Sequence, residues 1–279
     1  MDQFLALFNQ VTPTARAFFS GNLCQLTNFD DPERLGYVHI LRSGRLRVDR
    51  PGMGSVMLTE PSLLFAPRHA PHSFVPDGKN GVDLVCATVE LGGNQGSPVA
   101  QSLPAMMIVP IAQVETMAPT LDLLMSEAFD ARDGRQFALD RLFEYLIVQL
   151  LRYAVAMGQV EGGVLAGLAE PRLARALTAM HDAPGKSWTL DDLADCAGMS
   201  RTRFAVLFRS VIGTTPIDYL ARWRMMIAQT MLRQGKSVKA VAAALGYDSP
   251  AALSRSFAKI VGVSPRAWSA IGSGEGDLE

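Results

Sequence analysis

Cysteines and long hydrophobic runs are both scarce in this sequence, and each absence excludes a class of protein. The 279 residues include three cysteines, too few and too scattered for the disulfide framework of a small secreted protein. The most apolar stretch, 103–112, is short and contains two prolines, so it lacks the length of a membrane-spanning helix. No cationic segment followed by an apolar one opens the chain, as in a secretory signal. We therefore expect a cytoplasmic protein with no membrane partner.

Net charge is also close to zero, but the two halves of the chain differ. The formal net charge is -1, and residues 1–169 carry 12 Lys and Arg against 17 Asp and Glu, whereas 170–279 carry 14 against 10. A basic half suits a polyanionic partner such as nucleic acid, although an ordinary solvated surface has the same charge. The length and the 48% hydrophobic content are sufficient for two domains.

The first half has the pattern of a β-rich domain. Between residues 37 and 91, short apolar runs alternate with turns rich in glycine, proline and asparagine. Residues 45–48 alternate between polar and apolar, as in a half-buried strand, and 82–91 is apolar on both faces, which is typical of an interior strand. Short, evenly spaced strands favour a β-barrel or a β-sandwich.

Helical periodicity replaces this pattern over 120–131 and 135–157. Such a helical hairpin either packs on the β-domain or joins two copies of the chain into a homodimer, and the sequence leaves both alternatives open. The four glycines of 158–170 predict a linker over 158–169. The expected amphipathic stripe of the second helix consists of Phe137, Leu142, Tyr145, Leu146, Gln149 and Tyr153.

Residues 170–271 carry helix-start and helix-end signals in a repeated order. Thr189 with Asp192 resembles a capping box. A short helix, a glycine turn and a second helix occur twice, with an offset of 49 residues between Phe208 and Phe257. This unit is a helix-turn-helix, which places its second helix in the major groove of DNA. The stretch 216–233 between the copies predicts one helix of about 27 Å, long enough to hold the two second helices roughly one DNA turn apart.

Here the sequence resembles the AraC/XylS family of regulators, through TLDDLADCAGMSRTRFAVLFRSVIGTTPIDYL and SVKAVAAALGYDSPAALSRSFAKIVGVSP. The resemblance covers about 171–268 and implies a seven-helix domain that binds double-stranded DNA and activates or represses transcription, with RNA polymerase as a partner. The first half resembles the cupin domain of an AraC-type subgroup through HILRSGRLRV, PRHAPHSF, LVCATVEL and LPAMMIVPI. That subgroup includes regulators that respond to reactive chlorine or other oxidants.

We therefore expect an α+β protein with four parts. A cupin-like sensor domain, with a β-barrel and the helical hairpin, spans 1–157, and the linker spans 158–169. An all-α DNA-binding domain with two helix-turn-helix units spans 170–271, and a flexible tail spans 272–279.

Helical spacing assigns the side chains that face DNA. In the second unit, burial of Leu253 and Phe257 turns Arg255 outward, where a guanidinium reads guanine, and the family has an arginine at this position. A surface salt bridge is the alternative role of Arg255. In the first unit, Val206 replaces the family's usual arginine, so we expect contacts with thymine methyl groups and phosphates there. The expected DNA-binding residues are Arg201, Thr202, Arg203, Ala205, Val206 and Arg209 in the first unit, and Ser249, Ala251, Ser254, Arg255 and Lys259 in the second.

Thiols and imidazoles cluster in the first half of the chain. His39, His69 and His72 lie there, and imidazole suits zinc or copper. The resemblance to oxidant-responsive regulators makes Cys24 and Cys86 the expected signal-sensitive pair, with the 120–157 helices passing the signal on; the alternative is that each thiol is a small buried hydrophobe.

Two further alternatives concern the nature of the first half. One is a barrel that binds a small-molecule inducer without redox chemistry. The other is a cupin enzyme with an appended DNA-binding domain, which needs three or four metal ligands. Because His69 and His72 have no carboxylate in the same motif, we expect a regulator without catalytic residues.

Overall fold

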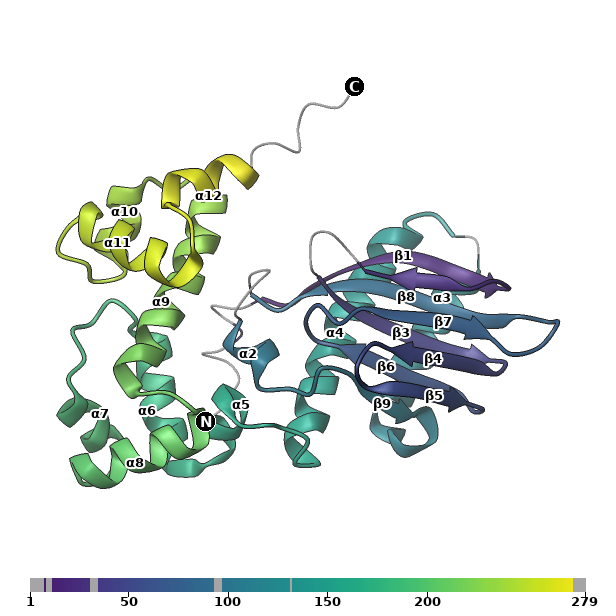
Figure 1. Cartoon of the computed structure of the whole chain (residues 1–279), viewed down its shortest axis with the longest axis horizontal. Coiled ribbons are helices and arrows are strands. Elements are labelled where there is room, and N and C mark those ends of the chain that lie inside the picture. Colours follow the sequence, from purple (N-terminus) through teal and green to yellow (C-terminus); the bar gives the residue numbers. More distant parts are fainter. Residues whose placement is uncertain (1–7, 9–11, 31–34, 93–96, 131, 273–279) are drawn as a thin grey trace. The chain divides into compact units, whose positions relative to one another are not determined.

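The computed structural model describes residues 8, 12–30, 35–92, 97–130 and 132–272. It divides into two compact units (Figure 1). The first, here called the sheet unit, comprises 13–96 and 103–161, and the second, the helix unit, comprises 1–12, 97–102 and 162–279. The tail expected at 272–279 lies outside the described residues, except for Gly272 at the end of a helix.

The strands of the sheet unit form two antiparallel sheets. Their strand orders are β1-β8-β3-β6-β9 and β2-β7-β4-β5. β8 lies between β1 and β3, which confirms the interior strand predicted over 82–91. The strands are β1 (Thr14–Leu23), β2 (Thr27–Phe29), β3 (Gly36–Ser43), β4 (Leu46–Arg50), β5 (Gly54–Leu58), β6 (Ser62–Ala66), β7 (His72–Pro76), β8 (Val82–Glu90) and β9 (Met107–Pro110).

One hydrophobic core contains side chains from both sheets. In β4, Leu46 and Val48 are buried while Arg47 is exposed, which confirms the predicted alternation. The rings of Phe29 on β2 and Phe74 on β7 lie with their centroids 4.7 Å apart in this core. The expected β-rich domain is therefore confirmed. It begins with β1 and β2, which precede residue 37, where the turn-rich pattern of the sequence starts.

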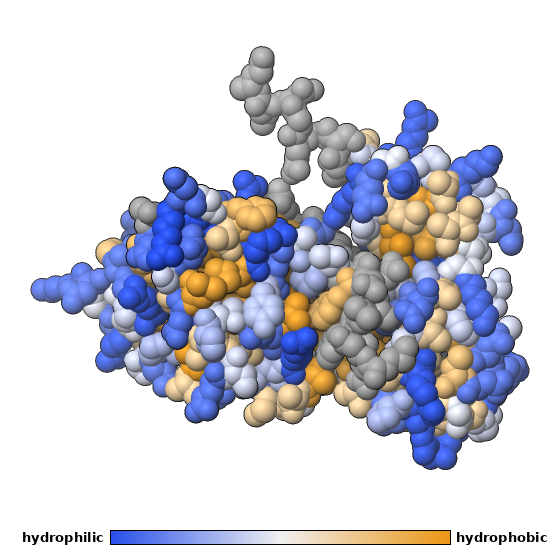
Figure 2. Space-filling view, turned by 180° about the vertical axis from the view of Figure 1, so that it is seen from behind, coloured by the Kyte–Doolittle hydropathy of each residue, from blue (hydrophilic) through white to orange (hydrophobic). Residues whose placement is uncertain are grey.

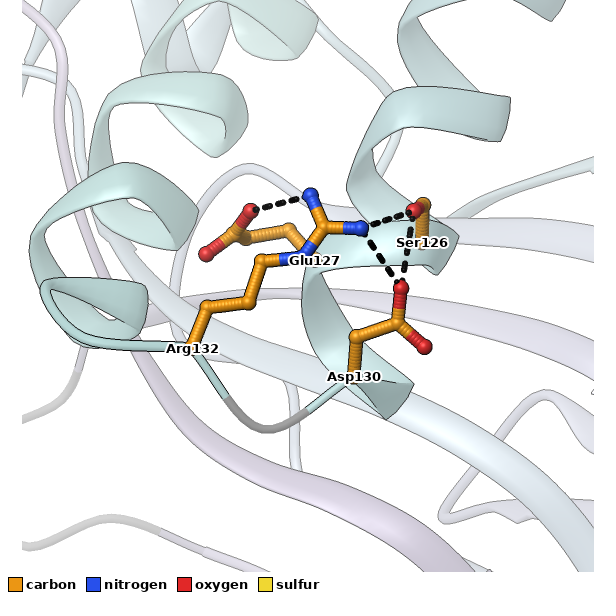
Figure 3. A network of polar contacts seen from close by, with 4 residues as sticks. All are labelled: Ser126, Glu127, Asp130 and Arg132. Carbon is orange, nitrogen blue, oxygen red and sulfur yellow. Dashed lines mark hydrogen bonds and ion pairs between the residues drawn. The ribbon is translucent and has the colours of Figure 1, made fainter.

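The predicted helical hairpin is also present, as α3 (Ala118–Phe129) and α4 (Arg135–Ala156). α4 packs on β1, where the backbone N–H of Ala17 donates to Asp140 Oδ1 at 2.8 Å. Between the helices, Arg132 donates to Asp130 at 2.7 Å and lies 3.8 Å from Glu127 (Figure 3). Packing on the β-domain, one of the two alternatives for this hairpin, is thus confirmed.

The side of α4 that faces the sheet differs from the expected stripe. Phe137 is 71% exposed and Tyr145 is 52% exposed, whereas the buried side is formed by Leu139, Phe143, Leu146, Ile147 and Leu150. Two neighbouring stripes of α4 are apolar, so periodicity alone allowed either, and contact with β1 selected one. Seen from behind, hydrophobic residues reach the surface between hydrophilic ones on the sheet unit (Figure 2).

The helix unit contains a segment that is inserted between two strands in the sequence. This segment, α2 (Pro98–Gln101), lies within the stretch 92–104 that has the composition of a loop, and it packs on α5 (Gly163–Ala169). The backbone N–H of Leu165 donates to Ser102 Oγ at 3.3 Å. The remaining helices are α6 (Pro171–Asp182), α7 (Leu190–Ala197), α8 (Arg201–Ile212), α9 (Pro216–Arg233), α10 (Val238–Ala244), α11 (Pro250–Val261) and α12 (Pro265–Gly272).

The second half of the expected linker at 158–169 is therefore a helix, and the prediction was wrong there. Val164, Leu165 and Leu168 of α5 are buried. Gly167 of α5 packs closely on α6, since a Cβ at this position would lie 2.7 Å from Leu177 Cδ1 and that side chain would have to shift. A glycine-rich composition is shared by flexible linkers and by tightly packed helices, so the sequence alone did not separate them.

Among the described residues, no helix combines the length and the apolar content needed to cross a membrane.

Candidate nucleic-acid interface

The first helix-turn-helix unit consists of α7 and α8. The predicted capping box is present: Thr189 Oγ1 accepts from the backbone of Asp192 at 3.1 Å, and the backbone N–H of Thr189 donates to the Asp192 carboxylate at 2.9 Å. Arg175 of α6 donates to the carbonyl oxygen of Ala197 at 2.7 Å, where α7 ends. These bonds fix the start and the end of α7, and thereby the turn that leads into α8.

The outward face of α8 is the one predicted from helical spacing. Phe204 and Phe208 are buried, and Val206 on the opposite side is 67% exposed. Arg201 is exposed but paired, since its guanidinium lies 3.2 Å from Asp191, so a phosphate would compete with this carboxylate for it. The other expected contact residues of this unit are Thr202, Arg203 and Arg209, which are exposed, and Ala205, which is half-buried.

The second unit consists of α10 and α11, and here too the predicted orientation is found. Leu253 and Phe257 are buried, while Arg255 is exposed. Among the described residues, no carboxylate pairs with Arg255 or with the exposed Lys259. A surface salt bridge, the alternative role of Arg255, therefore finds no carboxylate partner among the described residues.

The serines of the second unit have local partners. Ser249 caps α11, since its Oγ accepts from the backbone of Ala252 at 3.1 Å. This bond does not use the hydroxyl hydrogen, which is the atom that a phosphate contact requires. The half-buried Ser254 donates to the carbonyl oxygen of Pro250 at 2.8 Å, so its oxygen is left as an acceptor. Ala251 is exposed beside them at the start of α11.

A single helix joins the two units. α9 has the predicted 18 residues, which corresponds to about 27 Å at about 1.5 Å per residue. Its apolar side includes the buried Leu220 and Ile227, whereas Ile217 is 47% exposed. Arg224 of the same helix is half-buried and hydrogen-bonded.

A buried polar cluster lies in the core of the first unit. His181 Nε2 lies 2.6 Å from the Tyr219 hydroxyl, and the His181 ring stacks on Trp223 with centroids 3.9 Å apart. Burial lowers the pKa of His181 to about 3 and raises the pKa of Tyr219 well above its ordinary value. Both groups are therefore neutral at physiological pH. In the sequence, His181 is a lone histidine at the end of a helix, and nothing near it indicates the contact with Tyr219.

The structure separates the two cysteines that were expected to act as a pair. β1 does lie beside β8, but Leu23 pairs with Val82 and Phe19 pairs with Cys86. Cys24 thus lies five residues along the chain from Phe19, the position opposite Cys86, or about 17 Å at about 3.3 Å per residue. A disulfide requires Cα atoms within about 7 Å, so a direct Cys24–Cys86 bond does not fit this arrangement.

The two thiols also lie in different environments. Cys86 is buried in the core, and burial raises the pKa of its thiol. Cys24 is exposed, and its Sγ donates to Asn22 Oδ1 at 2.8 Å. The thiolate is the reactive form of cysteine, so the buried Cys86 is the less reactive of the two.

Two of the three expected metal ligands meet in the core of the sheet unit. The Nε2 atoms of His39 and His72 are 3.0 Å apart. His72 Nδ1 donates to the carbonyl oxygen of Ala70 at 2.7 Å, so the Nε2 of a neutral His72 accepts and that of His39 donates. His39 Nδ1 is then a buried acceptor without a hydrogen-bond partner. Burial lowers the pKa of both imidazoles.

His69 is placed apart from this pair, 3.4 Å from Asp30. Within the described ranges, no group of three His, Cys, Asp or Glu residues is arranged to hold a metal ion. Zinc in proteins takes three or four protein ligands, so the His39–His72 pair does not fit the expected zinc site, and we derive no metal chemistry from it.

Comparisons with known proteins match different families to the first and the last part of the chain. Residues 2–156 match the family model described as Cupin, and residues 193–270 match the one described as Helix-turn-helix domain. A putative AraC-like transcription regulator of Streptomyces lividans is 34% identical over 183 residues, which cover 62% of this chain and 60% of the relative. The chain thus spans less than two thirds of that relative's length.

Two other comparisons extend over different parts of the chain. The RCS-specific HTH-type transcriptional activator RclR of Escherichia coli is 27% identical over 233 residues, 81% of either chain. The solved DNA-binding domain of AdpA in complex with a target DNA is 32% identical, covers 37% of this chain and 94% of that one, and has a TM-score of 0.36.

Proposed function

The chain belongs to the cupin family and carries an AraC-type helix-turn-helix domain, and from this premise we propose that it regulates transcription by binding double-stranded DNA. The observation that carries the proposal is the exposed basic face on the second helix of each unit, above all Arg255. A guanidinium on the outward face of a recognition helix makes bidentate contact with guanine. In this function the chain acts in the cytoplasm and activates or represses transcription, with RNA polymerase as a partner, and it carries out no catalysis.

Binding to duplexes recovered by selection from random-sequence DNA tests this proposal. We expect the full chain to bind a selected duplex at least 10³-fold more tightly than random DNA. The affinity should fall steeply with salt, because phosphate contacts release counterions. Equal affinity for selected and random duplexes would refute sequence-specific regulation.

For the signal, we propose an oxidant that acts first on Cys24. Its support is the exposure of Cys24 together with the burial of Cys86. A two-electron oxidant such as peroxide or hypochlorite converts a thiol to a sulfenic acid, with the oxidant reduced to water or chloride. The Cys86 thiol attacks this sulfenic acid, forming the disulfide and releasing water, only when β1 separates from β8, since the native register keeps the thiols apart.

Serine variants of each cysteine, assayed with a reporter gene after hypochlorite, peroxide or metal challenge, test this step. We expect Cys24→Ser to abolish the response to oxidant and Cys86→Ser to weaken it. Unchanged responses in both single variants would eliminate redox sensing and leave a ligand as the signal.

A small-molecule signal is the second candidate, because a cavity of about 420 Å³ lies beside α3. Its volume is in the range of ligand sites. Its apolar side includes Ile111, Leu121 and Phe129, and Arg42 lies at its edge with its guanidinium 4.7 Å from the Phe129 ring centroid. The space between the sheets, by contrast, is filled by packed aromatic and imidazole rings, which argues against a ligand-filled barrel.

We propose that the signal passes to the helix unit through α2 rather than through the 120–157 helices. α2 is covalently joined to β8 on one side and to β9 on the other, yet it packs on α5. α5 in turn packs on α8, the second helix of the first unit. A movement of α2 would therefore reach α8 through its contact with α5.

The exposed side of α4 supports a homodimer. Phe137 and Tyr145 are large and exposed there, and the Arg141 guanidinium lies 5.4 Å from the Phe137 ring centroid; aromatic side chains and arginine are enriched at protein interfaces. Sedimentation of the full chain and of a Phe137→Ser, Tyr145→Ser variant tests this, and a monomeric wild-type chain at micromolar concentration would contradict it.

A further inference from the structure

The two helix-turn-helix units touch each other directly, in addition to their contacts with α9. The loop 183–188, which leads into α7, lies against the turn 244–247, which leads into α11. A Cβ at Gly185 would lie 2.5 Å from the carbonyl oxygen of Ala244, and a Cβ at Gly246 would overlap the carbonyl oxygen of Gly185. Gly246 also has a φ of +71°, which L side chains rarely adopt. The backbones of the two units therefore meet without intervening side chains.

Arg224 of α9 ties the same loop from the other side. Its Nε donates to the carbonyl oxygen of Pro184 at 2.7 Å, and its terminal nitrogen donates to that of Lys186 at 2.9 Å. Both acceptors belong to the loop of the first unit. An arginine that makes two charge-assisted bonds to one loop holds it in one orientation, because the guanidinium is planar.

The contact continues from Arg224 to the recognition helix of the second unit. The Arg224 guanidinium lies over the ring of Tyr247, 5.6 Å from its centroid. The Tyr247 hydroxyl lies 3.0 Å from Ser256 Oγ, and Ser256 is on α11. A path of hydrogen bonds and ring contact thus runs from the loop before α7, through α9, to the helix that carries Arg255.

We propose that Arg224, with Gly185 and Gly246, fixes the separation and the relative rotation of the two recognition helices, so that the chain accepts a single spacing between its two DNA half-sites. Arg224 is in this sense a positioning residue, and the proposal rests on the proposed DNA-binding function. One inserted base pair moves a half-site by about 3.4 Å and rotates it by about 35°. A rigid pair of units cannot follow both changes, whereas two units joined by α9 alone would adapt.

The test compares the full chain with Arg224→Met, which keeps much of the side-chain volume but removes the donors. Binding is measured on a selected duplex, on duplexes with one base pair inserted or deleted between the half-sites, and on a single half-site. For the wild type we expect at least a tenfold loss for either change in spacing. For Arg224→Met we expect less than a threefold loss, with unchanged affinity for the single half-site.

Arg222→Met is the matched control, because Arg222 is exposed on the same helix. If α9 merely contributes positive charge, both variants lose affinity equally on every duplex and the spacing ratio stays at the wild-type value, which would overturn the proposal. If Arg224→Met does not fold, Tyr247→Phe, which removes only the hydroxyl bonded to Ser256, should reduce the spacing ratio by a smaller factor, and an unchanged ratio in that variant overturns it too. Absence of any binding by the wild type would instead refute the proposed function.

Discussion

The two helix-turn-helix units have the same succession of helices but offer different chemistry to DNA. On α11 the side chain at the centre of the outward face is Arg255, while the corresponding face of α8 is centred on Val206. The first unit has additional packing partners, since α5 packs on α8 and the His181–Tyr219 contact lies in its core. The comparison suggests that the second unit reads bases and that the first unit positions the protein.

Removal of α5 should have the largest effect and should weaken the first unit selectively. Without α5, the partners of Val164, Leu165 and Leu168 become exposed. Each of these three buried side chains contributes about 1.5–3 kcal/mol to the free energy of unfolding. We expect fragment 162–272 to be about 5 kcal/mol more stable than fragment 170–272, as measured by urea unfolding. Equal stabilities would show that α5 is dispensable and that the expected boundary at 170 is adequate.

Replacement of Arg255 should separate base reading from positioning. We expect Arg255→Ala to weaken binding to the selected duplex by about 1–3 kcal/mol and to relax base preference at one position, with little change on random DNA. Lys259→Ala is the control, since loss of a phosphate contact weakens binding to all duplexes and lowers the salt slope by about 1. An equal loss on both kinds of DNA in Arg255→Ala would contradict direct readout.

Acid should destabilise the first unit through His181. The pKa of this imidazole is about 3 in the folded protein and about 6.5 when unfolded. Between these values the unfolded chain binds the extra proton, so stability is lost as the pH falls below about 6.5, by about 2 kcal/mol at pH 5. We expect urea unfolding of fragment 162–272 between pH 7 and pH 5 to show this loss, and His181→Gln to remove it. A variant with the wild-type pH dependence would refute the assignment to His181.

Substitution at Val206 should have the smallest effect. Val206→Ala removes two methyl carbons from an exposed position, so we expect a loss of at most about 1 kcal/mol in binding and no change in stability. Binding to duplexes with thymine or uracil at each position measures the methyl contact directly. Complete loss of selectivity in Val206→Ala would show that the first unit reads sequence as strongly as the second.

The helix unit was predictable because its signals are local. The capping box of α7, the start of α9 at Pro216 and the burial of Leu253 and Phe257 all follow from residues within two helical turns of one another. Helical spacing within each copy of the repeat was sufficient to assign both outward faces.

Predictions that required long-range partners were less successful. The stripe of α4 that contacts β1 was misassigned, since Phe137 and Tyr145 are exposed. The proximity of Cys24 and Cys86 depended on the register of β1 against β8. Register is set by the pairing of whole strands and not by the residues around each cysteine. The helix at 163–169 was hidden by glycines whose packing partners are distant in the sequence.

For this protein, short-range periodicity and capping were sufficient to define the two helix-turn-helix units and the residues they turn toward DNA. The separation of the thiols, the meeting of His39 with His72, the contact of α2 with α5 and the bonds of Arg224 to Pro184 and Lys186 were decided by tertiary structure. The physical reason is that a helix face is set by neighbours three or four positions away, whereas these contacts join residues that approach one another only when separate elements pack.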